Sequence, residues 1–104
     1  MGGRQERTPW RIRHIGRGAK QLLKMLPTSE WDRMGQELTH SPKPTPGQER
    51  RYCKPLAGPW KGHYEYCGFS GQFRDFRVIY RIDEAERAID LVDGGPHKIL
   101  EKRE

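Results

Sequence analysis

Between Lys54 and Ile99 the sequence contains Lys-Pro-Leu-Ala-Gly-Pro-Trp-Lys-Gly (Lys54–Gly62), Asp-Phe-Arg-Val-Ile-Tyr-Arg-Ile (Asp75–Ile82) and Asp-Gly-Gly-Pro-His-Lys-Ile (Asp93–Ile99). Short apolar and aromatic runs here alternate with turn residues, which predicts a meander of antiparallel strands. The strands are expected at 60–67, 73–83 and 88–92, and Gly94-Gly95-Pro96 is expected to end the last one.

The middle strand of this meander separates two kinds of side chain. Successive residues of a strand point to opposite faces of the sheet. One face suits packing on helices and holds Phe76, Val78, Tyr80 and Ile82. The other face holds Arg77, Ile79 and Arg81. Basic side chains therefore stand where a core strand would carry aliphatic ones.

Upstream of the meander the pattern changes to one strand and two helices. Residues 10–15 alternate large apolar and basic side chains, as an outer strand does. Ala19, Leu22, Leu23 and Leu26 follow at helical spacing, and Pro27 stops that helix. Thr28 or Ser29 can cap a second helix, whose apolar side holds Trp31, Met34 and Leu38.

The predicted fold is α+β, with a small antiparallel sheet and helices on one face. It consists of an N-terminal strand, a helical hairpin and then a three-strand meander. Residues 1–8 are expected to be a flexible N-terminal tail, and residues 9–104 a single domain.

Composition restricts the classes of function. Among 104 residues, 20 Lys and Arg stand against 14 Asp and Glu, a formal charge of +6 that favours an anionic partner. The apolar content is low, so the core is expected to be thin.

The expected compartment follows from three other features. Neither a membrane span nor a secretory signal is apparent, and the two cysteines are expected to be reduced thiols. Together these features predict a cytoplasmic protein.

The order of these segments resembles the RelE/ParE superfamily of toxin–antitoxin toxins. The resemblance rests on Lys-Pro-Leu-x-Gly-x-Trp-Lys-Gly from Lys54, on Phe-Arg-Val-Ile-Tyr-Arg-Ile from Phe76 and on the closing Gly-Pro-His at 95–97. It covers roughly residues 10–100 and is nearest to the YafQ/RelE mRNA interferases.

The resemblance implies a small basic ribonuclease that enters the ribosomal A site, cuts mRNA there and is neutralised by a cognate antitoxin. Cleavage in such toxins uses the ribose 2′-hydroxyl as the nucleophile, with no metal or cofactor. The resemblance assigns Arg77 to the catalytic concave face and His97 to the catalytic histidine of the YafQ-like branch. It also matches Asp75, with Phe76, to an important acidic–aromatic pair, and Lys54 to a basic position.

The sequence departs from the family at three places. The strand before the hairpin loop carries His63, Tyr64, Glu65, Tyr66 and Cys67 where RelE relatives place lysines. The hairpin loop at 68–75 is longer than usual. Relatives carry a Tyr or Phe a few residues past the histidine, whereas this chain has Leu100 and Glu101. A missing aromatic would remove a stacking partner for the scissile base and lower the efficiency of cleavage.

The residue chemistry fits cleavage of a phosphodiester by transesterification. Such a reaction needs a base, an acid and a charge stabiliser at the phosphate. Arg77 can bind two phosphate oxygens with its fork. His97 is the candidate acid or base, because histidine is the residue type suited to proton transfer near neutral pH. Glu65 is a candidate general base, although a structural ion pair with Arg77 is its more common role, and His63 is a spare base two residues away.

Five basic residues are candidates for contacts with RNA phosphates, although charged residues are also the usual occupants of a solvated surface. They are Lys54, Lys61, Arg74, Arg81 and Lys98. Together they predict binding to RNA that weakens steeply with salt.

Two other functions remain open at this point. A ParE-like inhibitor of DNA gyrase has the same fold without catalysis, and Arg77 with His97 argues against it. A non-catalytic RNA-binding or ribosome-binding protein is the second alternative, because fold alone does not decide function.

Overall fold

The computed structural model describes residues 10–40, 42 and 53–97. The expected tail at 1–8 lies outside the described residues, as do Lys98, Leu100 and Glu101. In chain order the elements are β1 (Arg11–Ile15), α1 (Arg17–Met25), α2 (Thr28–His40), β2 (Cys53–Pro55), a 3₁₀ turn (Gly58–Trp60), β3 (Tyr64–Tyr66), a second 3₁₀ turn (Gly71–Phe73), β4 (Phe76–Asp83) and β5 (Ala88–Pro96). No helix in the described ranges is long and apolar enough to cross a membrane.

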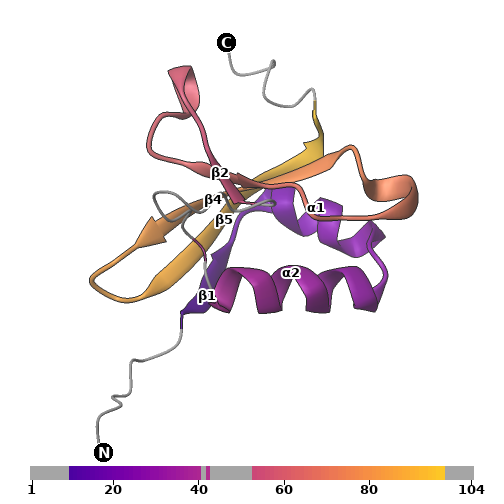
Figure 1. Ribbon diagram of the computed structural model, residues 1–104, viewed down its shortest axis with the longest axis horizontal. Coiled ribbons are helices and arrows are strands. Elements are labelled where there is room, and N and C mark those ends of the chain that lie inside the picture. Colours follow the sequence, from indigo (N-terminus) through magenta and orange to yellow (C-terminus); the bar gives the residue numbers. More distant parts are fainter. Residues whose placement is uncertain (1–9, 41, 43–52, 98–104) are drawn as a thin grey trace, which may run out of the picture.

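The strands form one five-stranded sheet in the order β1-β5-β4-β3-β2, with both helices on one face (Figure 1). Strands β2 to β5 pair antiparallel, as expected for a meander. Strand β1 instead pairs parallel to β5, with Ile12 beside Ile89 and Ile15 beside Leu91. The α+β class is therefore confirmed, but the sheet is mixed rather than wholly antiparallel.

All four strands after α2 differ in extent from the expectation, and β4 begins at Phe76 rather than at Phe73 because Gly71–Phe73 form a 3₁₀ turn. Strand β2 was not expected, the strand expected at 60–67 is reduced to β3, and β5 runs on to Pro96. Gly94 and Gly95 pair with Val78 and Arg77, so the glycines lie within the strand and do not end it. A Cβ on Gly94 would come within 2.9 Å of the Leu22 side chain, so this glycine allows α1 to lie close against β5.

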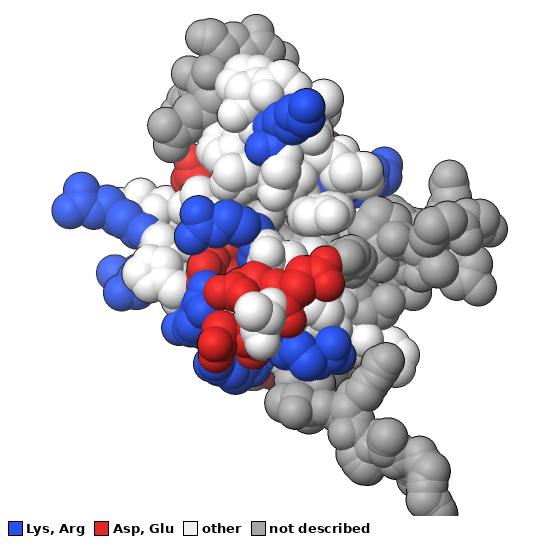
Figure 2. Space-filling model, turned by 90° about the vertical axis from the view of Figure 1, so that its left-hand side faces the viewer, with Lys and Arg blue, Asp and Glu red and all other residues white. Residues whose placement is uncertain are grey.

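A charge network joins β1 to β4 and β5 at the end where β4 turns into β5. Asp90 is buried and accepts two hydrogen bonds from Arg13, at 2.8 and 3.0 Å, and one from Arg81 at 3.2 Å. Arg13 also binds Asp83 at 3.1 Å. Figure 2 shows acidic side chains gathered at the centre of this end with basic ones around them. The network pairs charges that strand alternation places on the face of the sheet opposite the helices.

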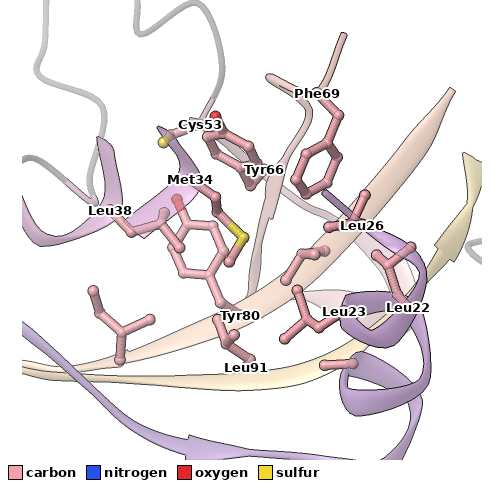
Figure 3. Packing of buried hydrophobic residues seen from close by; sticks show 13 residues of the cluster. Leu22, Leu23, Leu26, Met34, Leu38, Cys53, Tyr66, Phe69, Tyr80 and Leu91 are labelled. Atoms are coloured by element: carbon pink, nitrogen blue, oxygen red, sulfur yellow. The ribbon is translucent and has the colours of Figure 1, made fainter. Parts of the chain in front are cut away.

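The main core lies between the sheet and the helical hairpin. Figure 3 shows Leu23 of α1 and Met34 of α2 directed toward Tyr80 and Leu91 of the sheet. The expected apolar face of β4 is confirmed, because all four of its members belong to this cluster or pack against it. The aromatic residues Tyr66 and Phe69 supply much of the buried volume that aliphatic residues would supply elsewhere.

We call the opposite side of the sheet the open face. A small second cluster lies there, where Trp60 and Ile79 are buried and Leu56 and Val92 pack against them. Trp60 therefore packs on Ile79 and divides the open face into two ends. One end holds the network around Asp90, and the other holds Glu65 and Arg77.

Candidate active site

Glu65 and Arg77 form the centre of the candidate site, on neighbouring strands of the open face. Glu65 lies on β3 opposite Ile79 of β4, and Arg77 lies two residues before Ile79 on the same face. The side chains are 10% and 17% exposed, and Oε1 of Glu65 is 3.8 Å from Nε of Arg77. The ion pair that the sequence suggested for Glu65 is therefore present, and it is largely shielded from water.

The hydrogen bonds of Arg77 fix its guanidinium. Nη1 donates to the backbone carbonyls of Arg74 and Phe76, at 3.1 and 3.0 Å. Nε is buried without a hydrogen bond, as is Oε1 of Glu65. Within the described residues Nη2 donates to no protein group, so one arm of the fork is held by the backbone and the other remains available to a ligand.

The ends of β4 and β5 place Asp75 and His97 next to this pair. The backbone N–H of His97 donates to the carbonyl of Asp75 at 2.8 Å, which extends the ladder in which Arg77 pairs with Gly95. His97 is exposed. Gly95, the direct neighbour of Arg77, has no side chain, so β5 places no side chain beside Arg77 at that position.

The remaining predicted residues divide into those near the pair and those away from it. Lys54 pairs with Glu65 in the β2–β3 register and is exposed, and Arg74 supplies a carbonyl to Arg77. Lys61 is exposed on the turn that follows Trp60. Arg81 lies at the other end of the open face, bound to Asp90. The predicted contact of Lys98 lies outside the described residues.

His63 adds a further polar group to the open face. Its ring meets Trp60 edge-on, with centroids 5.4 Å apart. Its Nδ1 is buried without a hydrogen bond. Buried polar atoms are normally paired, and a catalytic role is one reason for an unpaired one. An atom of this kind is present in each of His63, Glu65 and Arg77. The sequence signal that placed His63 and Glu65 on one face was their spacing of two residues.

The loop between β3 and β4 is fastened by Glu30, a residue that the sequence analysis did not single out. Glu30 of α2 is buried and accepts hydrogen bonds from Ser70 Oγ at 2.6 Å and Ser70 N at 3.2 Å. Arg33 donates to Glu30 and to the Gly68 carbonyl. The hydrogen bond from Ser70 is the main cause that lowers the pKa of Glu30. This loop leads into Arg74 and Asp75, so the clamp helps to place the site.

Comparison with known proteins supports the fold. No family model matches the sequence, and no curated protein matches it significantly. A solved structure that matches is the crystal structure of the toxin-antitoxin complex RelBE2 from Mycobacterium tuberculosis, with a TM-score of 0.53. The match covers 88% of this chain and 94% of the matched chain at 18% sequence identity. The fold is RelE-like. The RelE-like fold expected from the sequence is thus confirmed.

Proposed function

We propose that this protein is the toxin of a toxin–antitoxin pair and that it cuts mRNA on the ribosome as a metal-independent endoribonuclease. The observation that carries the proposal is the shielded pair of Glu65 and Arg77 beside the strand ends of Asp75 and His97. The formal charge of +6 supports a nucleic-acid partner. The RelE-like fold, shared with a chain of the RelBE2 toxin-antitoxin complex, supports the toxin assignment.

Arg77 is the proposed stabiliser of the transition state. Its guanidinium stays charged and can donate to phosphate oxygens, and its position is fixed before the substrate binds. Two backbone carbonyls hold Nη1, so Nη2 can face the phosphorane without reorganisation. Preorganised donors of this kind stabilise developing charge more than mobile ones do.

Glu65 is the proposed base and His97 the proposed acid. The Glu65 carboxylate takes the proton from the ribose 2′-hydroxyl, and the 2′-oxygen then forms a bond to the adjacent phosphorus. The bond from phosphorus to the 5′-oxygen breaks, and the His97 imidazolium gives a proton to that oxygen. The products are a 2′,3′-cyclic phosphate and a 5′-hydroxyl. The proposed reaction requires no oxidant, metal or cofactor.

The other residues act on position rather than on the reacting atoms. Asp75 positions His97 through its backbone carbonyl. Lys54, Lys61, Arg74 and Lys98 are proposed to contact neighbouring phosphates. Arg81 is less suited to that role, because its charge already faces the buried carboxylate of Asp90.

The test is primer extension on a defined mRNA during translation with purified ribosomes. Wild-type protein should create new ends within codons, and only when ribosomes are present. Arg77→Ala should lower the cleavage rate by about 100-fold, as expected for loss of one preorganised donor. Arg81→Ala is the matched control, since it removes an arginine from the same strand and face, and it should cost far less.

Intact mRNA in the presence of folded wild-type protein would overturn the proposal. Inhibition of DNA supercoiling by gyrase would then establish the ParE-like alternative. Equal losses in Arg77→Ala and Arg81→Ala would instead indicate that the open face binds RNA by charge alone.

A further inference from the structure

The loop between β3 and β4 ends in two backbone carbonyls on which the candidate site depends. The carbonyl of Arg74 accepts a hydrogen bond from Nη1 of Arg77 at 3.1 Å. The carbonyl of Asp75 accepts one from the backbone N–H of His97 at 2.8 Å. Arg74 and Asp75 are the last two residues before β4. A shift of this end of the loop would therefore disturb both the guanidinium and the strand end that carries the imidazole.

The course of the loop toward these carbonyls is set by a turn that begins at Ser70. The Ser70 carbonyl accepts a hydrogen bond from the N–H of Phe73 at 3.1 Å. The Gly71 carbonyl accepts one from the N–H of Arg74 at 3.2 Å. Gly71 has a φ of 62°, a left-handed conformation that glycine adopts without strain. The orientation of the Ser70 backbone therefore determines where the two carbonyls lie.

Both carboxylate oxygens of Glu30, on α2, hold Ser70. Oε1 accepts a hydrogen bond from the Ser70 N–H at 3.2 Å, and Oε2 accepts one from the Ser70 hydroxyl at 2.6 Å. Two separate contacts fix the orientation of Ser70 as well as its distance from the helix. Arg33 donates to Oε1 of Glu30 at 3.2 Å and to the Gly68 carbonyl at 3.1 Å. The first half of the loop is therefore tied to α2.

Apolar packing also holds the loop, but it does not orient the backbone. Phe69 is buried, and its ring meets that of Tyr66 edge-on with centroids 5.1 Å apart. Burial of apolar surface is non-directional, whereas a hydrogen bond weakens steeply away from its preferred angle. The directional constraint on the Ser70 backbone therefore comes from Glu30.

We propose that Glu30 is a positioning residue for the cleavage of RNA, and that it acts through Ser70 and the following turn on Arg77 and His97. Glu30 lies on α2, on the side of the sheet opposite the open face, so it does not touch the reacting atoms. Donors that are held in place stabilise developing charge more than mobile ones do. That the positioned groups cleave RNA rests on the proposed function, whereas the series of hydrogen bonds does not.

The first test is hydrogen exchange of the His97 amide, measured by NMR on the whole protein without RNA. Amides at a strand end exchange through local opening, so a general loss of stability does not set their rate. Glu30→Ala should raise the exchange rate by about tenfold, the effect expected when one hydrogen bond is weakened. The control Asp90→Ala removes another buried carboxylate that is bound to arginines, at the far end of the open face, and should leave the rate unchanged.

The second test is the rate of mRNA cleavage on ribosomes. Glu30→Ala should lower kcat by about 10–100-fold, because a small misplacement of the reacting groups is costly, and KM should change little. Glu30→Gln keeps an acceptor for the Ser70 N–H and an amide that can donate to the Ser70 hydroxyl, so it should restore most of the rate. Asp90→Ala should retain the wild-type kcat. If Glu30→Ala does not fold, Ser70→Ala removes the hydroxyl contact alone and should give smaller changes in the same directions.

Several outcomes would overturn the inference. They are an unchanged exchange rate at His97 in Glu30→Ala, equal increases in Glu30→Ala and Asp90→Ala, and a loss of activity confined to KM. A rate for Glu30→Gln no better than that of Glu30→Ala would assign the effect to charge and would also contradict positioning. If wild-type protein cuts no mRNA, the proposed function fails, while exchange at His97 still decides whether Glu30 positions the strand end.

Discussion

Glu65 and Arg77 face each other across β3 and β4, with Oε1 3.8 Å from Nε and both atoms buried. This separation is within reach of strong electrostatic attraction but exceeds the length of a hydrogen bond. The pair is therefore held together by charge and by the surrounding backbone. A carboxylate that is near a guanidinium but not closed onto it keeps a lone pair for another proton.

Conservative changes at this pair should separate charge from geometry. Arg77→Lys keeps the positive charge but loses the planar fork, so cleavage of mRNA should fall by about 10–100-fold. Glu65→Gln keeps the shape but removes the base, and its cleavage rate should lose the limb of the pH profile that reports that base. Single-turnover rates across pH measure both effects. An unchanged pH profile in Glu65→Gln would assign the base to another group.

The clamp between α2 and the β3–β4 loop should contribute measurably to stability. Ser70→Ala removes the 2.6 Å hydrogen bond to Glu30 and leaves a buried carboxylate short of a donor. The free energy of unfolding should fall by about 1–3 kcal/mol. Urea denaturation measures this loss, and Gln36→Ala on an exposed position of α2 is the control. A loss of unfolding free energy no larger than that of the control would show that the clamp does not stabilise the fold.

Acid should weaken the fold through Asp90. Arg13 holds the pKa of Asp90 below its ordinary value. A carboxyl group with a lower pKa in the folded state adds stability above its unfolded pKa of about 3.9, and this stability is lost as pH falls through the folded pKa. Unfolding measured from neutral pH down to about pH 3 should show a shallower decline in Asp90→Asn than in wild type. Parallel declines would contradict this origin.

Two glycines should respond oppositely to alanine. A Cβ on Gly16 would lie 2.6 Å from the Val92 carbonyl, while one on Gly35 of α2 would meet nothing within 4 Å. Gly16→Ala should therefore destabilise the fold by about 1–3 kcal/mol through overpacking. Gly35→Ala should stabilise it by up to about 1 kcal/mol through helix propensity. Thermal unfolding of both variants checks the signs, and two losses of similar size would contradict the packing described here.

Local periodicity predicts most of this fold, and the differences arise where tertiary contacts decide. The faces of β4 follow from alternation, and both helices follow from their apolar spacing. The parallel pairing of β1 with β5 is invisible locally, because Arg13 and Asp90 are 77 residues apart. Gly94-Gly95-Pro96 carries a turn signal, yet Gly94 lies in the strand to make room for Leu22.

Local alternation likewise predicts part of the candidate site, and long-range contacts decide the rest. Alternation places Arg77 on the open face, and the ion-pair interpretation of Glu65 is confirmed by their separation. Alternation also placed Arg81 beside it, but the structure binds Arg81 to Asp90 at the far end. The clamp of Glu30 on Ser70 joins residues 40 positions apart and carries no sequence signal. The catalytic roles of Arg77, His97 and Glu65 and the positioning role of Asp75 remain predictions.

The most direct test of the central claim is chemical. Once the cleaved position of an mRNA is mapped on the ribosome, a matched mRNA with one 2′-deoxynucleotide on the 5′ side of that bond is offered to wild-type protein. We predict that cleavage at the position disappears and that fragments of the natural mRNA carry a 2′,3′-cyclic phosphate and a 5′-hydroxyl. Cleavage of the deoxy-substituted mRNA at an unchanged rate, or of neither mRNA, would contradict cleavage by the ribose hydroxyl at this site.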